Sequence, residues 1–72
     1  MTQNYDAVLL CGRLEGDFIG DRVYGRIFGD TLITGDHPFA NGTPIRTSAA
    51  VSYEDGILLT QSGTRYRVEI DR

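Results

Sequence analysis

Apolar and polar side chains alternate in three short runs along the last third of the chain, 45–53, 57–61 and 65–70. The runs are rich in β-branched and aromatic residues, and a period of two is typical of half-buried strands. Turn sequences that contain glycine separate the runs. The pattern therefore predicts a C-terminal three-stranded meander of antiparallel strands.

The first turn of this meander, 54–56, allows two registers. A two-residue turn places Tyr53 opposite Leu58, whereas a three-residue loop with a left-handed Gly56 places Tyr53 beside Ile57. A shift of one residue moves every side chain of a strand to the other face of the sheet. We favour the three-residue loop, because it gathers the apolar side chains on one side.

The second turn, 62–63, is interpreted as a two-residue loop. Together the two turns predict a buried face that carries two cross-strand rows: Val51, Leu59 and Tyr66, and Tyr53, Ile57 and Val68. The opposite face is predicted to carry small and guanidinium side chains, which suit a contact surface or an ordinary solvated outer face: Arg46, Ser48, Ala50, Ser52, Leu58, Thr60, Arg65, Arg67 and Glu69.

The first half of the chain predicts further short strands. The first strand is expected at 5–14, and its run 8–11 is too apolar to have one face in water, so it is expected to be the most buried strand. Two more strands are expected at 22–28 and 31–34, and 35–43 has the composition of a loop. No segment shows helical periodicity with caps. The expected fold is a single all-β domain over 1–72, a five- or six-stranded antiparallel barrel or sandwich with little or no helix.

The length of 72 residues limits the core, because a domain of this size buries only about 60% of its unfolded surface. A single cysteine, Cys11, excludes an internal disulfide framework. Association into a homodimer is one remaining way to bury more area. The start of the chain lacks the pattern of a signal peptide, and no apolar run reaches the length of a membrane span. We therefore expect a cytoplasmic protein.

The charge balance is acidic, with a net charge of −3, a pI near 4.8 and no lysine. A general nucleic-acid binder usually has a pI well above neutrality, and this chain does not. Turn-forming Gly-Asp pairs concentrate acids in the first half of the chain. These loops are candidates for contact with a basic partner, through Asp17, Asp21 and Asp30.

Catalytic and metal chemistry find little support in the residue types. Cys11 and His37 would be the candidates for a thiol nucleophile and its base, but Cys11 lies in the most apolar run, where a thiol is inert. The spacing of the acids matches neither an EF-hand loop nor a calcium-binding nonapeptide repeat. We expect no enzymatic activity, no cofactor and no metal site.

The arginines of the predicted contact face, Arg46, Arg65 and Arg67, favour two kinds of partner. With Tyr24 or Tyr53 nearby they would form a platform for single-stranded nucleic acid, as small barrels do. However, the favoured register sends Tyr53 to the core. Arginine without lysine also suits a protein interface.

The segments 25–30, 41–48 and 62–67, together with the Asp-Gly turn, resemble a pattern in short proteins of bacteriophages and prophages that mostly lack an assigned function. The likeness covers roughly residues 20–70 and consists of turn and strand motifs. It implies a phage accessory protein that acts in a bacterial host cytoplasm, where small inhibitors of host defence, including anti-CRISPR proteins, are a frequent type. The leading hypothesis is a non-enzymatic protein that binds and inhibits or modulates a host protein or nucleoprotein complex. The alternative is a small nucleic-acid-binding barrel.

Overall fold

A computed structural model describes residues 4–12, 14, 17–33, 35 and 38–70. It contains five strands, β1 (Ala7–Cys11), β2 (Arg22–Phe28), β3 (Thr43–Glu54), β4 (Ile57–Thr60) and β5 (Arg65–Ile70). The described ranges contain no helix, and so none that is long and apolar enough to cross a membrane. The predicted all-β class and the C-terminal meander are confirmed.

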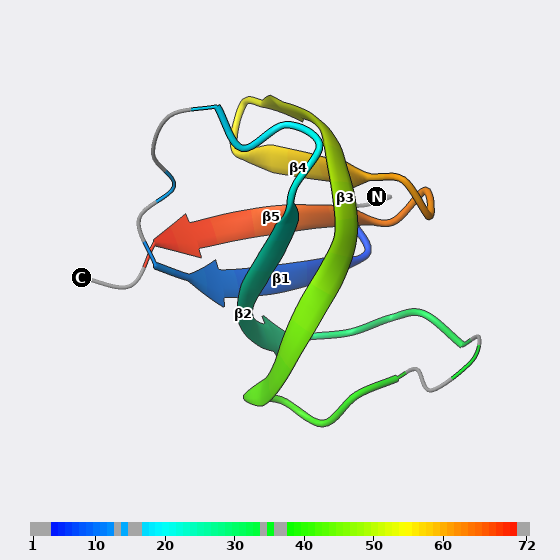
Figure 1. The fold of residues 1–72 in the computed structure, drawn as a ribbon. Coiled ribbons are helices and arrows are strands. Elements are labelled where there is room, and N and C mark those ends of the chain that lie inside the picture. Colours follow the sequence, from blue (N-terminus) through cyan, green and yellow to red (C-terminus); the bar gives the residue numbers. More distant parts are fainter. Residues whose placement is uncertain (1–3, 13, 15–16, 34, 36–37, 71–72) are drawn as a thin grey trace.

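The five strands close into a barrel in the order of the sequence (Figure 1). Each strand pairs antiparallel with the next, so the direction reverses four times between β1 and β5. An even number of reversals leaves the first and last strands running the same way. The pair that closes the barrel is therefore parallel, from Ala7 opposite Tyr66 to Cys11 opposite Ile70. A fully antiparallel barrel would have needed an even number of strands.

The long strand β3 joins the two halves of the barrel. It pairs with β2 along its first part and with β4 along its last part. The register shifts once in each ladder, and both shifts place an extra residue in β3, between Arg46 and Ala49 and between Ala50 and Ser52. Such bulges bend a strand and increase its twist. β3 thus curves around the barrel, as Figure 1 shows.

A buried threonine stabilises the first of these shifts. The Thr47 hydroxyl accepts a hydrogen bond from the Val23 amide at 3.0 Å and donates one to the carbonyl of Ser48 at 2.7 Å. A buried amide without a partner would cost about 1–3 kcal/mol. The threonine side chain therefore replaces the ladder bond that the extra residue displaces.

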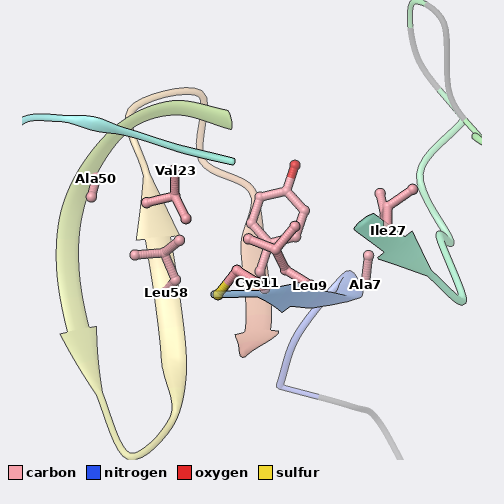
Figure 2. Packing of buried hydrophobic residues seen from close by; sticks show 8 residues of the cluster. Ala7, Leu9, Cys11, Val23, Ile27, Ala50 and Leu58 are labelled. Atoms are coloured by element: carbon pink, nitrogen blue, oxygen red, sulfur yellow. The ribbon is translucent and has the colours of Figure 1, made fainter. Parts of the chain in front are cut away.

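The barrel interior is filled by a few large aliphatic side chains and several small ones (Figure 2). The buried apolar residues are Ala7, Leu9, Cys11, Val23, Ile27, Ala50, Leu58 and Tyr66. Gly25 faces Cys11 across the β1–β2 ladder, and a Cβ atom at Gly25 would lie 2.6 Å from the Leu10 carbonyl oxygen. The interior of a narrow barrel tapers, so it alternates large and small residues.

The predictions for the first half of the chain have mixed outcomes. β1 is mostly buried, as expected, but spans only Ala7–Cys11 of the predicted 5–14, whereas β2 spans the predicted residues 22–28. The predicted strand 31–34 is wrong for 31–33, which form no strand, and Thr34 lies outside the described residues. The Thr31 amide and hydroxyl both bond the Asp6 carbonyl, and the Leu32 amide bonds the Asp30 carboxylate. The Leu32–Asp30 bond is a local side-chain bond of the kind that competes with a ladder for the backbone.

The predicted three-residue loop at the first turn of the meander is wrong. Asp55 and Gly56 both have positive φ, at 52° and 77°. Two consecutive left-handed residues form the two-residue type I′ turn, whose twist matches that of the flanking strands. Glu54 therefore lies opposite Ile57, and Tyr53 lies opposite Leu58.

The predicted length of the second turn is also wrong by one residue, but this loop is longer than predicted, whereas the first is shorter. The predicted two-residue loop at 62–63 is a three-residue loop over 61–63, because the Thr60 amide bonds the Thr64 carbonyl at 3.0 Å. The residue that pairs with Tyr66 is consequently Leu58, whereas the prediction paired Leu59 with Tyr66. The Ser48 hydroxyl on β3 accepts a hydrogen bond from the Ser62 amide at 3.1 Å and so holds the loop from outside the hairpin.

These two shifts exchange the faces of β4 and part of β3. Leu58, Ala50 and Thr60 were predicted on the contact surface and are buried. Val51 was predicted to be buried and is 50% exposed, while Leu59 is half-buried on the outside. Tyr53 was also predicted to be buried and is 37% exposed, although a ring contact with Phe18, at 5.6 Å between centroids, covers part of it. The prediction that the three arginines of the meander are exposed is confirmed.

Candidate partner-binding surface

The outer side of the β2–β3 ribbon carries an exposed aromatic ring among cations. We call this set the Arg–Tyr surface and define it as Arg22, Tyr24 and Arg26 on β2 and Arg46 on β3. Tyr24 is 65% exposed, which is unusual for a large ring. Figure 1 shows β2 and β3 side by side along one side of the barrel.

Strand periodicity sets this arrangement. Val23 and Ile27 point into the barrel and are buried, so the residues that alternate with them point outward. Tyr24 and Arg46 are direct cross-strand partners. Opposite residues of an antiparallel pair have Cβ atoms about 4.5–5.5 Å apart, which places the Arg46 side chain within reach of the ring. Tyr24, Arg26 and Arg46 therefore lie on the regular part of the ladder, and Arg22 lies beyond the register shift.

The Arg–Tyr surface is locally basic on an acidic protein. Neither β2 nor the first seven residues of β3 contain an acid. Within the described ranges, no carboxylate forms an ion pair with Arg22, Arg26 or Arg46. Arg26 is held in place by a 3.0 Å hydrogen bond from its Nη1 to the carbonyl of Gly42. Three guanidinium groups thus present their charge to solvent beside one ring.

The other two arginines of the predicted contact face lie elsewhere. Arg65 and Arg67 are on β5, between β4 and β1, whereas Arg46 is on the β2–β3 ribbon. Arg67 forms a 3.0 Å ion pair with Glu69, and both side chains are about half exposed. Exposed pairs of this kind add at most about 1 kcal/mol to stability. The structure therefore does not combine the three predicted arginines into one site.

Arg65 borders an open groove of about 290 Å³ on the outside of β3, β4 and β5. The half-buried Ile57 and Leu59 line it together with Glu54 and Asp55. The lining thus combines two carboxylates with one guanidinium group. This mixture favours no single sign of ligand charge, in contrast with the Arg–Tyr surface.

The three predicted acidic contacts also lie apart. Asp17 and Asp21 are exposed in the segment between β1 and β2, whose backbone bonds that of Ala50 on β3. Asp30 has a structural role, because its carboxylate accepts hydrogen bonds from the amides of Leu32 and Phe39 at 3.0 and 2.9 Å. Asp30 thus stabilises the loop between β2 and β3 and is half-buried there.

Of the two residues considered for thiol chemistry, only Cys11 is among the described residues. Cys11 is buried, and burial raises the pKa of its thiol. A thiol in this environment is a poor nucleophile. His37, its predicted partner, lies outside the described residues. In the described ranges, no three potential metal-binding side chains gather in one place.

Sequence reasoning missed Arg22 and Arg26 as site residues and gave Tyr24 only as a neighbour of the arginine face. The signal was present as Arg-x-Tyr-x-Arg within a correctly predicted strand. A period of two places these three side chains on one face, opposite the buried Val23 and Ile27. The pairing of that face with Arg46 depends on the register of the β2–β3 ladder, which the alternation did not reveal.

Comparison with known proteins adds no relative. No protein-family model matches this chain, and neither the curated proteins nor the solved structures contain a match.

Proposed function

We propose that this protein is a non-enzymatic binding module that docks a host protein or nucleoprotein complex on its Arg–Tyr surface and thereby inhibits or modulates it. The observation that carries the proposal is the 65% exposed Tyr24, placed in register with Arg46 and flanked by Arg22 and Arg26. Tyrosine and arginine are the residues most enriched among the energetic centres of interfaces.

The rest of the molecule is consistent with binding as its activity. The thiol of Cys11 is buried, and Asp30 bonds backbone amides. The five described strands close into a barrel, so none of them is an edge strand to which a partner could add a further strand. A partner would therefore contact side chains on the outside of the barrel, and the Arg–Tyr surface offers the largest exposed ring there.

The resemblance to short phage proteins is the reason for proposing a bacterial host and action in its cytoplasm. Within that setting, a CRISPR effector or another defence complex is the class of target we propose. Such targets are assemblies of protein and nucleic acid, and both components would offer groups that interact with arginine and tyrosine.

Affinity capture tests the proposal. The tagged protein is incubated with bacterial lysate, with and without nuclease, and recovered partners are quantified by mass spectrometry. The double variant Tyr24→Ala/Arg46→Ala is compared with Arg67→Ala, a control that removes an outward arginine of β5 outside the Arg–Tyr surface. Surface changes of this kind usually alter stability by no more than about 0.5 kcal/mol, so both variants should fold.

We expect wild type and Arg67→Ala to recover the same partner in near-stoichiometric amount and the double variant to lose it. Equal recovery by all three proteins would show that another surface makes the contact. Failure of the wild type to recover any partner would contradict the proposed function itself.

A further inference from the structure

We infer that the Arg–Tyr surface binds single-stranded nucleic acid, with a base stacked on Tyr24 and phosphates on Arg22, Arg26 and Arg46. The inference rests on the proposed function, because it names the chemistry of the partner at the same surface. It differs from the sequence-based hypothesis in its residues, since Arg65 and Arg67 lie on β5.

The exposed ring supplies the stacking element. Single-stranded binding without sequence preference combines a basic surface with aromatic side chains on which bases stack. Tyr24 is the one ring of this ribbon that is more than half exposed, and its backbone is held in the β2–β3 ladder opposite Arg46. A ring on a backbone held in this way loses less conformational freedom on binding than one on a mobile segment.

The arginines surround the ring in two directions. Arg22 and Arg26 lie two residues before and after Tyr24 on β2, roughly 6.6 Å along the strand in each direction. Arg46 lies across the ladder. Each guanidinium group can bond a phosphate with two parallel N–H groups, a geometry that lysine lacks. A strand of nucleotides that crosses the ring therefore meets a cation on either side.

The available geometry favours single strands over duplexes. In a duplex the bases stack on one another, and a protein reaches their edges by inserting a helix or ribbon into a groove. Tyr24 projects from the outside of a closed barrel and needs an unstacked base.

Charge elsewhere on the molecule limits the footprint. Asp21 precedes Arg22, and Glu54, Asp55 and Glu69 lie on the β3–β5 side of the barrel. These carboxylates repel a polyanion, so the contact is confined to about three phosphates. Three phosphates predict a slope of log K against log salt of about −2, because each contributes about −0.7 for single strands.

Fluorescence anisotropy tests the inference with three labelled probes. These are an oligothymidylate of about 12 nucleotides, within the site sizes of small barrels, a duplex of equal length, and a polyglutamate peptide of equal charge. Wild type, Tyr24→Ala, Tyr24→Phe, Arg46→Ala and the control Arg67→Ala are titrated at several salt concentrations, after thermal unfolding has shown that each variant folds.

We expect oligothymidylate to bind more tightly than either other probe. Tyr24→Ala should weaken its binding by about 5- to 150-fold, since a stacked base contributes roughly 1–3 kcal/mol. Tyr24→Phe, which keeps the ring, should bind as wild type does. Arg46→Ala should reduce the salt slope by about 0.7, and Arg67→Ala should leave it unchanged.

Three results would overturn the inference: no binding of oligothymidylate at low salt, equal binding by Tyr24→Ala, or preferential binding of polyglutamate. Capture of a lysate protein after nuclease treatment, lost in Tyr24→Ala/Arg46→Ala, would leave the proposed function standing even then. Conversely, ring-dependent binding of oligothymidylate without any captured protein would support this inference and contradict a protein target.

Discussion

The two faces of the β4–β5 ribbon differ sharply, although their residues are neighbours in the sequence. Leu58 is fully buried and faces the buried Tyr66 across the ladder. Leu59 is half-buried and faces the exposed Arg65 at the edge of the open groove. Two leucines in a row thus have different roles, one in the barrel interior and one on its outer surface.

The difference shows that hydrophobicity alone does not assign a face in a small barrel. A narrow interior accepts few large side chains, so aliphatic residues also remain outside, as Ile57 and Leu59 do. The turn before β4 decides which leucine is inside, because a change of one residue in the loop length moves every side chain of the strand to the other face. The following predictions test how strongly each feature separates the two faces.

The largest expected effect distinguishes the two leucines directly. Leu58→Ala removes a fully buried side chain and should lower the free energy of unfolding by about 2–5 kcal/mol. Leu59→Ala truncates a half-buried side chain outside the barrel and should cost about 1 kcal/mol or less. Urea denaturation measures both. If Leu59→Ala lowered the free energy of unfolding more than Leu58→Ala, the result would favour the three-residue loop at the first turn.

Glycine packing in the interior gives the next effect. A Cβ atom at Gly25 would lie 2.6 Å from the Leu10 carbonyl oxygen and 2.9 Å from Leu9 Cδ1. Gly25→Ala should therefore cost about 1–3 kcal/mol, the usual range for overpacking. The control is Gly12→Ala, where nothing lies within 4 Å of the added atom. If the two variants have equal thermal midpoints, the interior is less tightly packed here than the contacts indicate.

The turn that sets the register should be sensitive to backbone conformation. Gly56 has a φ of 77° with nothing within 4 Å of an added Cβ, so Gly56→Val is strained by its backbone and not by a clash. We expect a loss of about 1–2 kcal/mol. Gly56→Asn is the matched control, because asparagine tolerates the left-handed region and should lose less. Thermal unfolding of the two variants compares them.

The smallest effect concerns the partner of Leu58. Burial raises the pKa of Tyr66, and the negative charges of Asp30 and Asp6 raise it further. The unfolded chain therefore loses this proton at a lower pH than the folded protein does. Stability should be insensitive to this group below pH of about 10, the ordinary tyrosine pKa, and should fall as the pH rises above it.

Tyr66→Phe should flatten this alkaline decline, because the variant has no phenol to ionise. Urea unfolding at several pH values between 8 and 11 measures the slopes of both proteins. The comparison uses the slope with pH, so a loss of stability at neutral pH does not disturb it. If the free energy of unfolding fell equally with pH in both proteins, ionisation of Tyr66 would not be the cause of the loss of stability at alkaline pH.

The alternation and the glycines by themselves determined the all-β class, the bounds of β2 and β5 and the exposure of the arginines. These depend on local geometry, since a strand has a period of two wherever it lies. The faces of β3 and β4 were decided by tertiary structure. Both turns contain glycine and accept either loop length. The Ser48 contact with the second turn comes from β3, a strand outside that hairpin, and the extra residue between Ala50 and Ser52 lies in β3, several residues before the first turn.

The candidate site was likewise determined in part by the sequence and in part by the tertiary structure. The Arg-x-Tyr-x-Arg pattern already placed three side chains on one face of β2, but its position beside Arg46 and away from Arg65 required the order of strands around the barrel. Residues far apart in the chain become neighbours only through ladder pairing. For this protein, composition and period determined which side chains each strand carries on a given face. Closure of the barrel determined which of these faces lie side by side.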